Sequence, residues 1–232
     1  MRALIPAGAW RALQPLRFGA VFGRSYDAPR YWRHRLRAYG FTLRGVGHVG
    51  MTEAANEAMY EAAAATLRTV CATAGVKLGE ARVLDVGCGT GFYAEVCRAA
   101  GCASYVGADI TDVLFAAMRA RYPGYRFVRR DAGREPLPGS HDLVLLIDVT
   151  QHVTDARRFD YLIGNVAARV RSGGVLVFTS WLDAWKRETF YERSRTLGAY
   201  TAALPGWRLA DPVPFRDKWM VAAHKPESSR RG

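Results

Sequence analysis

Apolar and polar residues along the chain follow two alternating patterns. Short apolar runs of the kind that form strands are each followed by a stretch with apolar residues at helical spacing. The runs that predict strands are 83–86, 105–109, 125–129, 143–148, 175–179, 207–213 and 218–224. The helical patterns cover 52–75, 91–100, 111–121, 159–170 and 186–199.

This order predicts an α/β fold with a doubly wound, mostly parallel seven-stranded sheet and helices on both faces. Residues 143–148 are the most apolar run and are expected near the centre, because a central strand is buried on both faces. Ligands of such sheets bind beyond the carboxyl ends of the strands, where the winding direction switches. Candidate functional residues are therefore sought in the loops that follow strands.

The first 50 residues lack these patterns and contain several prolines and glycines. We expect an irregular arm over 1–50 that acts as a lid, a main domain over 51–226 and a flexible tail over 227–232. Arginines interrupt any apolar run of signal-peptide type near the start. No stretch approaches the roughly 18 unbroken apolar residues of a spanning helix, so a cytoplasmic protein is expected.

Most of the formal net charge of +12 comes from the arm. Residues 1–44 hold nine arginines and a single acid, Asp27, which gives a local balance of +8. Codon bias in a GC-rich genome also produces excess arginine, so a solvated or packed arm is the default interpretation. A basic arm can alternatively contact a membrane surface, an acidic substrate or nucleic acid.

The four cysteines form no C-x-x-C pair and have no histidine at zinc spacing. This pattern favours reduced thiols over disulfides or a zinc site. Asp148, His152 and Asp155 could together supply metal ligands. Their spacing is not diagnostic, and no metal is predicted.

A glycine-rich turn, D-V-G-C-G-T-G, follows the first strand at residues 85–91. Glycines at alternate positions let the backbone turn tightly and approach a ligand, with a helix N-terminus pointing at it. Gly89, Gly91 and Ala94 also satisfy the dinucleotide spacing G-x-G-x-x-A, which makes NAD an alternative ligand. Asp85 would repel a pyrophosphate but suits a cationic amino-acid moiety.

Residues 83–91, V-L-D-V-G-C-G-T-G, resemble the first motif of class I S-adenosylmethionine-dependent methyltransferases, and the resemblance extends over 55–225. It implies S-adenosylmethionine as the cofactor. It also implies that Asp109 binds the ribose hydroxyls and that Ile110 packs on the adenine. The cofactor-binding residues implied are Asp85, Gly87, Gly89, Asp109, Ile110, Asp131, Ala132 and Asp148. The alternative for each acid is a simple helix cap.

In this family Asp131 would meet the adenine amino group, and the amide of Ala132 would reach the ring. Transfer to a hydroxyl also needs a group that removes the proton. His152 follows the fourth strand, where many small-molecule members carry a histidine, and it is the first candidate base. Its alternative role is structural, bonded across the loop. His48, in the glycine-rich segment 45–50, is the second candidate.

Motifs of several other methyltransferase classes are missing. The chain has no [DNS]-P-P-[YFW] turn after the fourth strand, no paired-glutamate loop and no cysteine nucleophile at the fourth or fifth strand end. We therefore expect a small-molecule, sugar or lipid-linked acceptor, methylated on a hydroxyl oxygen, with no stable nucleic-acid partner and at most weak contact with a membrane surface. The residues expected to bind the acceptor are Tyr31, Trp32, Trp181 and Trp185. An RNA methyltransferase and an inactive cofactor-binding module are the alternatives.

Overall fold

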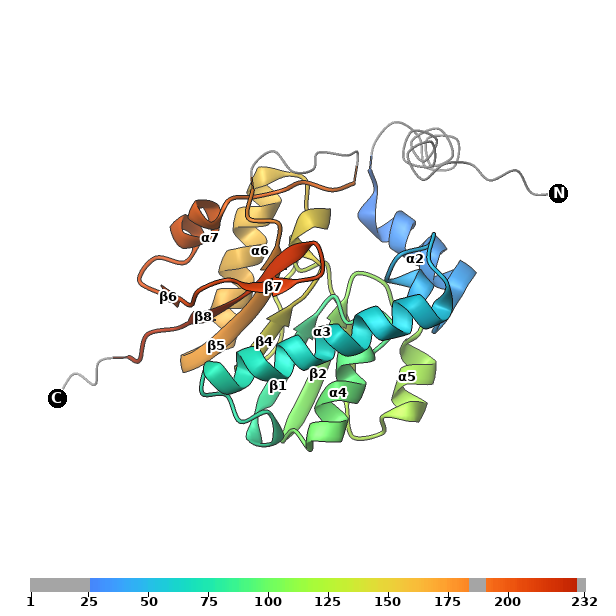
Figure 1. The fold of residues 1–232 in the computed structure, drawn as a ribbon, viewed down its shortest axis with the longest axis horizontal. Coiled ribbons are helices and arrows are strands. Elements are labelled where there is room, and N and C mark those ends of the chain that lie inside the picture. The colour runs from blue at the N-terminus through green and yellow to red at the C-terminus, as the bar shows by residue number, and fades with distance from the viewer. Residues whose placement is uncertain (1–25, 184–190, 229–232) are drawn as a thin grey trace.

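The computed structural model describes residues 26–183 and 191–228, and its centre is a mostly parallel sheet (Figure 1). The strand order is β3-β2-β1-β4-β5-β8-β6, with β7 paired to β8. Strands β1 to β5 run parallel to one another, whereas β8 is antiparallel to β5, β6 and β7. The strands are β1 (Arg82–Val86), β2 (Ser104–Asp109), β3 (Arg126–Arg129), β4 (His141–Leu146), β5 (Val170–Ser180), β6 (Arg208–Leu209), β7 (Val213–Phe215) and β8 (Lys218–His224).

Helices cover both faces of this sheet (Figure 1). The α-helices are α2 (Ala28–Tyr39), α3 (Glu53–Thr73), α4 (Phe92–Ala100), α5 (Phe115–Arg121), α6 (Ala156–Arg169) and α7 (Leu197–Ala203). Short 3-10 turns are η1 (Leu43–Gly45), η2 (Leu78–Glu80) and η3 (Thr150–His152). The predicted doubly wound fold with helices on both faces is thereby confirmed.

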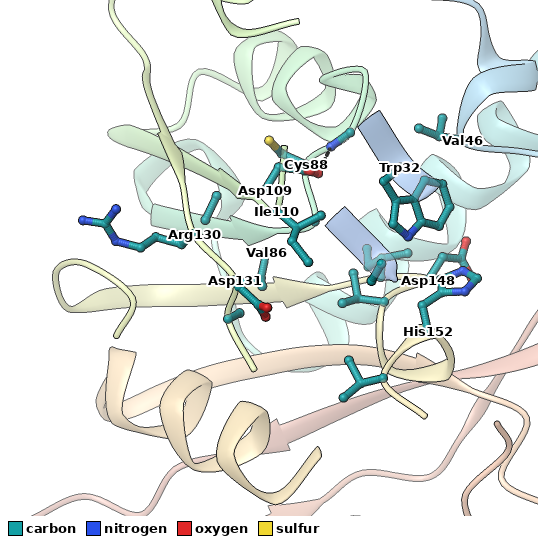
Figure 2. Close-up of a pocket in the computed structure, with 18 of the residues that line it drawn as sticks. Trp32, Val46, Val86, Cys88, Asp109, Ile110, Arg130, Asp131, Asp148 and His152 are labelled. Atoms are coloured by element: carbon teal, nitrogen blue, oxygen red, sulfur yellow. Dashed lines mark hydrogen bonds between the residues drawn. The ribbon is translucent and has the colours of Figure 1, made fainter. Parts of the chain in front are cut away.

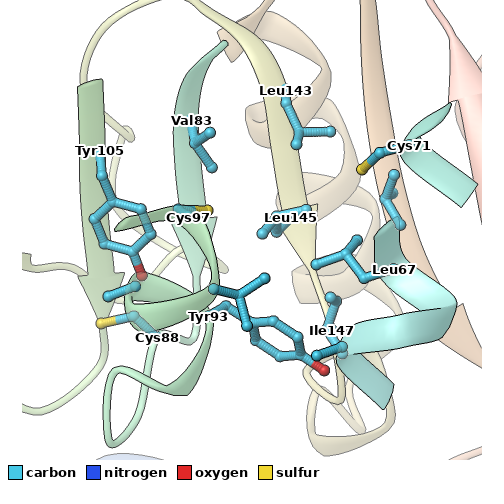
Figure 3. Close-up of a cluster of buried hydrophobic side chains, with 14 of the residues drawn as sticks. Leu67, Cys71, Val83, Cys88, Tyr93, Cys97, Tyr105, Leu143, Leu145 and Ile147 are labelled. Carbon is cyan, nitrogen blue, oxygen red and sulfur yellow. The ribbon is translucent and has the colours of Figure 1, made fainter. Parts of the chain in front are cut away.

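Two apolar clusters hold the layers together, one on each face of the sheet. Side chains of a strand alternate between faces, so Val83 of β1 packs with α3, α4 and α5, whereas Leu84 packs with α6 and α7. Figure 3 shows the first cluster, which includes Leu67 of α3, Cys97 of α4 and Leu143 of β4. Because both faces of β1 and β4 are covered, their carboxyl ends are the edge of the sheet at which a ligand can enter.

The last part of the sheet differs from the prediction. The expected strand over 207–213 is two short strands, β6 and β7, which both pair with β8, so the described residues form eight strands rather than seven. Pro212 lies between them and lacks the N–H that a continuous ladder needs. The pairing with β8 also shifts by one residue between Leu209 and Val213, and Pro214 is accommodated within β7, so the interruption coincides with this change of register.

The predicted helix over 186–199 is wrong for residues 191–196, whereas residues 197–199 are helical. Residues 191–196 are not helical, and α7 begins only at Leu197, where Thr196 caps it by accepting from the Ala199 amide. The backbone N–H of Arg193 instead donates to the carbonyl of Gln151 at 2.8 Å. Tertiary hydrogen bonding has replaced local helix formation here. Residues 184–190 lie outside the described residues.

The arm is more regular than expected, because α2 occupies its second half. Asp27 accepts a hydrogen bond from the Arg30 amide at 2.9 Å, and Pro29 lies in the first turn, where its missing N–H is harmless. The residues Asp27-Ala28-Pro29 therefore indicate a helix start. None of the described helices combines the length and apolarity needed to cross a lipid bilayer.

Candidate active site

A cavity of about 1030 Å³, part of it open to solvent, lies beyond the carboxyl ends of β1, β2, β3 and β4 (Figure 2). Figure 2 shows Asp109, Ile110 and Asp131 at one end, and Trp32, Asp148 and His152 at the other. The arm helix α2 closes part of the wall. The predicted loops after β1, β2, β3 and β4 therefore converge on one cavity, whereas the described residues that follow β5 do not line it.

The glycine turn after β1 forms the floor of the cavity. Gly87 has a φ of +81°, and a Cβ there would lie 2.3 Å from Cγ2 of Val149. A Cβ on Gly89, whose φ is +52°, would lie 2.9 Å from Cγ1 of Val46 in the arm. Both positions therefore require glycine, for conformation and for space. The hydroxyl of Thr90 in the same turn is buried and has no hydrogen-bond partner among the described residues.

Asp109 ties the end of β2 to this turn. Its Oδ2 accepts from the Gly89 amide and its Oδ1 from the Thr111 amide, both at 3.0 Å. Burial raises the pKa of Asp109, and these amide hydrogen bonds oppose that rise. A carboxylate oxygen can accept more than one hydrogen bond, so these contacts leave room for a ligand hydroxyl. Ile110 lies beside it in the wall.

Asp131, after β3, is held by Arg158, which no sequence motif marks as a site residue. Nη2 of Arg158 donates to both carboxylate oxygens, at 2.9 and 2.7 Å, and the Gly133 amide donates at 3.1 Å. Arg158, Asp131 and Ala132 all line this end of the cavity. No local pattern predicts the pair, because the two residues are 27 positions apart.

Asp85 is not in the wall of the cavity. Its side chain shares the face of β1 with Val83, which α3, α4 and α5 cover, and its carboxyl accepts from the Tyr105 hydroxyl of β2 at 2.6 Å. Burial raises the pKa of Asp85 to about 7, although the Tyr105 hydrogen bond lowers it. The geometry thus places Asp85 behind the strand end, while its neighbour Val86 lines the cavity.

Asp148, at the end of β4, carries an ion-paired carboxylate into the wall. Nη1 of Arg216 donates to Oδ2 at 2.6 Å, and Nζ of Lys218 donates to Oδ1. Burial raises the pKa of Asp148, but the two cations outweigh it and bring the pKa to about 2. The backbone φ of +58° is unusual for a residue other than glycine. Its amide is held by the Thr179 hydroxyl at 2.8 Å.

His152 lines the cavity and is enclosed by aromatic rings. Its ring lies edge-on to Trp32 at 5.0 Å between centroids and stacks on Tyr191 at 5.8 Å. Nδ1 donates to the Tyr191 carbonyl oxygen at 3.1 Å. Removal from water, together with the charges of Lys218 and Arg35, lowers the pKa of His152 to about 4, despite this hydrogen bond. The imidazole is therefore neutral near pH 7.

The other predicted site residues are divided between the wall and the interior. Trp32 lines the cavity, whereas Tyr31 is buried and stacks on Tyr191 at 5.5 Å. Trp181 is buried outside the wall, and its Nε1 donates to Asp217 at 3.1 Å. His48 is exposed away from the cavity, with its backbone held by Asn56. Trp185 lies outside the described residues.

The described ranges hold no group of three or more histidine, cysteine, aspartate or glutamate side chains that could bind a metal ion. Asp155 caps α6 by accepting from the Arg158 amide at 2.8 Å, and Asp148 is engaged by two cations. The alternative metal set of Asp148, His152 and Asp155 is therefore not assembled.

A family profile described as a methyltransferase domain matches residues 55–216. Solved structures with a similar fold include the N-methyltransferase NodS from Bradyrhizobium japonicum WM9 with S-adenosyl-L-homocysteine, at 18% identity and a TM-score of 0.58, over 72% of this chain and 87% of that one. The magnesium protoporphyrin IX methyltransferase from Synechocystis PCC 6803, also with bound S-adenosyl-L-homocysteine, has 17% identity and a TM-score of 0.62. That match covers 83% of this chain and 93% of the other.

An O-methyltransferase family protein from Burkholderia thailandensis is similar at 17% identity and a TM-score of 0.57, over 75% of this chain and 60% of that one. No curated protein sequence matches the chain. At these identities the structural likeness establishes the fold alone. The three neighbours differ in their acceptors by name, so none of them identifies the acceptor here.

Proposed function

The chain belongs to the class I S-adenosylmethionine-dependent methyltransferases, and from this premise we propose that it methylates a hydroxyl oxygen of a small-molecule, sugar or lipid-linked acceptor. The proposal is supported chiefly by the residues that line the two ends of one cavity. A glycine cradle and two carboxylates line one end, and a neutral histidine lines the other.

The residues present fit the cofactor. Gly87 and Gly89 keep the turn after β1 tight, because a Cβ on either would collide with Val149 or Val46. The buried Thr90 hydroxyl in this turn has no partner among the described residues and can bond a polar group of the cofactor. Asp109 would accept from the ribose hydroxyls, with Ile110 against the adenine. Asp131 and Ala132, at the same end, would meet the edge of the adenine. Asp85 does not line the cavity, and its effect on the cofactor would be indirect, through its buried hydrogen bond with Tyr105.

When bound, S-adenosylmethionine supplies a methyl group already activated on a positively charged sulfur. His152 then accepts the proton of the acceptor hydroxyl. Because Nδ1 donates to the Tyr191 carbonyl, Nε2 is the nitrogen that holds the free lone pair. Trp32, Leu36 and Val46 line the cavity from the arm, and they exclude water and limit the positions that the acceptor can take.

The arm supports the lid role assigned to it. Arg35 donates to the Gly47 carbonyl at 2.6 Å and to the Arg44 carbonyl at 3.2 Å, which joins α2 to the segment that carries Val46. Arg35 of α2 thus serves the internal structure of the arm. This favours a small acceptor inside the cavity over an RNA that lies along a basic surface, although a steep salt dependence of RNA binding would reverse that preference.

The test combines cofactor titration with a transfer assay. Asp109→Ala removes a charged acceptor for the ribose, so calorimetry should show S-adenosylhomocysteine binding weaker by roughly tenfold to a hundredfold. Asp112→Ala, an exposed acid three residues later, is the matched control. Tight binding of NAD instead would contradict the cofactor assignment.

Transfer is then measured from labelled S-adenosylmethionine to a panel of hydroxyl, carboxylate and amine acceptors and to RNA. Methylation of a hydroxyl acceptor supports the proposal. Methylation of RNA or amines alone would contradict the acceptor class, and cofactor binding without any transfer would favour an inactive binding module.

A further inference from the structure

Two cations from the β7–β8 hairpin share a single carboxylate beside the cavity. Arg216 and Lys218 both pair with Asp148, and the three side chains are only 14%, 9% and 20% exposed. Buried charges are normally matched by opposite charges, because their removal from water is unfavourable. This trio retains one net positive charge.

Two polar groups at the same place lack partners among the described residues. The guanidinium of Arg216 lies over the ring of Tyr60 at 4.3 Å and uses Nη1 for Asp148, but its Nε donates to no described group. The hydroxyl of Tyr93 is also without a partner, on a side chain that is 8% exposed and lines the cavity. Buried donors without acceptors are rare in folded proteins, and they indicate that a ligand oxygen belongs there.

The topology places this trio away from the adenosine end. In the sheet order, β8 lies beyond β5 on one side of β4, whereas β2 and β3 lie on the other. Asp109 ends β2 and Asp131 follows β3, so the hairpin lies on the opposite side. Arg216 and Lys218 are not themselves in the wall of the cavity, but Arg216 contacts Asp148 and Tyr60, which are. The positive charges of Lys218 and Arg35 lower the pKa of His152. The excess positive charge is therefore next to the proposed base.

We propose that Arg216, assisted by Lys218 and Tyr93, binds an oxyanion of the acceptor, a carboxylate or phosphate group close to the atom that is methylated. This inference rests on the proposed function, since it specifies the acceptor for that site. A guanidinium with free N–H groups suits an oxyanion, because charge-assisted hydrogen bonds are stronger than neutral ones. The bound anion also neutralises the charge left by the trio.

The test uses small probes on the protein loaded with S-adenosylhomocysteine. Benzoate and phenyl phosphate supply the two oxyanions, and benzyl alcohol is an uncharged molecule of similar shape. Calorimetry should show at least one of the two anions binding about tenfold or more tightly than the alcohol. The anion that is preferred identifies the acceptor group as a carboxylate or a phosphate.

Arg216→Gln should abolish the preference for the anion, and Arg216→Lys should retain part of it, because the charge remains. Arg208→Gln, an exposed arginine on the neighbouring β6, should leave the preference unchanged. Thermal unfolding of each variant separates loss of binding from loss of the fold.

Equal binding of anions and alcohol by the wild type would overturn the inference. So would an Arg216→Gln variant that loses S-adenosylhomocysteine affinity tenfold but keeps its preference for the anion, since the cations would then serve the cofactor. A wild type that binds no S-adenosylhomocysteine would instead refute the proposed function, and the anion titration repeated without it would still decide the oxyanion site.

Discussion

Nδ1 of His152 lies 3.1 Å from the carbonyl oxygen of Tyr191. A carbonyl oxygen can only accept a hydrogen bond, so the neutral imidazole must carry its proton on Nδ1. The contact joins the turn after β4 to a segment 39 residues later. Arg195 adds a second link between these two segments, because its Nη1 donates to the Thr150 carbonyl at 3.0 Å. Its guanidinium also lies 3.9 Å from the centroid of the Phe159 ring. The tautomer and position of His152 are thereby set by tertiary contacts.

His152→Ala should lower the turnover number by about 10²–10⁴-fold, the usual contribution of general-base catalysis. Affinity for S-adenosylhomocysteine should stay within about twofold, because the residues assigned to the ribose and adenine are at the other end of the cavity. Steady-state kinetics and calorimetry measure the two effects. His48→Ala is the control, since His48 is exposed and outside the wall. Loss of turnover in His48→Ala alone would show that the base is His48 of the arm.

The pH dependence of kcat/KM should have no ionisation at the ordinary histidine value. The pKa of His152 is lowered to about 4 by removal from water and by neighbouring cations. Only the neutral ring accepts a proton, so the rate rises with pH through about 4. It should therefore be flat from about pH 5.5 to 8. A limb near 6.5 that disappears in His152→Ala would show a solvated imidazole and contradict this prediction.

The parts of the site that could be predicted from the sequence are those that lie next to their own strand. The glycine turn, Asp109, Ile110 and Asp131 each follow a strand, and parallel strands bring their carboxyl ends to one edge. The location of Asp85 could not be predicted. A strand buried on both faces gives no polar alternation to show which side chain faces the ligand.

Residues whose role depends on a partner far away in the sequence could not be predicted from the sequence pattern either. Arg216 and Lys218 meet Asp148 across 68 and 70 positions, and a hairpin arginine is otherwise indistinguishable from a solvated one. Tyr191 lies within residues 186–199, which the sequence pattern predicts as a helix. Its carbonyl is available to His152 because those residues are not helical, which only the tertiary hydrogen bonds decide.

Trp32→Ala should change both acceptor binding and the ionisation of His152. The indole lies in the cavity wall and 5.0 Å from the imidazole, so its removal admits water to that ring. The KM for the acceptor should rise about tenfold, which is on the order of 1.4 kcal/mol. The pKa of His152 should move up from about 4 towards its ordinary value of 6.5, since water stabilises the charged form.

The acid limb of kcat/KM and an NMR titration of the imidazole both measure this shift. Trp219→Ala removes a tryptophan that is 39% exposed on β8 and serves as the matched control. An unchanged His152 titration in Trp32→Ala would show that the indole does not shield it.

Asp85→Asn should alter how stability depends on pH. The pKa of Asp85 is raised from 3.8 to about 7 by burial, so the native state keeps its proton where the unfolded chain has lost it. Stability from this group is complete below about pH 4 and falls as the pH rises through 7. At 1.36 kcal/mol per pKa unit the full difference is on the order of 4 kcal/mol. Asparagine does not titrate and can still accept from Tyr105, so this decline should be absent in the variant.

Urea unfolding at several pH values between about 4.5 and 7.5 measures the effect as the difference in unfolding free energy between wild type and Asp85→Asn. Other groups titrate equally in both proteins and cancel in that difference. The wild type should lose stability relative to the variant as the pH rises, whereas Asp112→Asn, at an exposed position, should follow the wild type. Parallel curves for wild type and Asp85→Asn would mean that the buried carboxyl is already ionised at low pH. Tyr105 would then stabilise the charged form more than burial destabilises it.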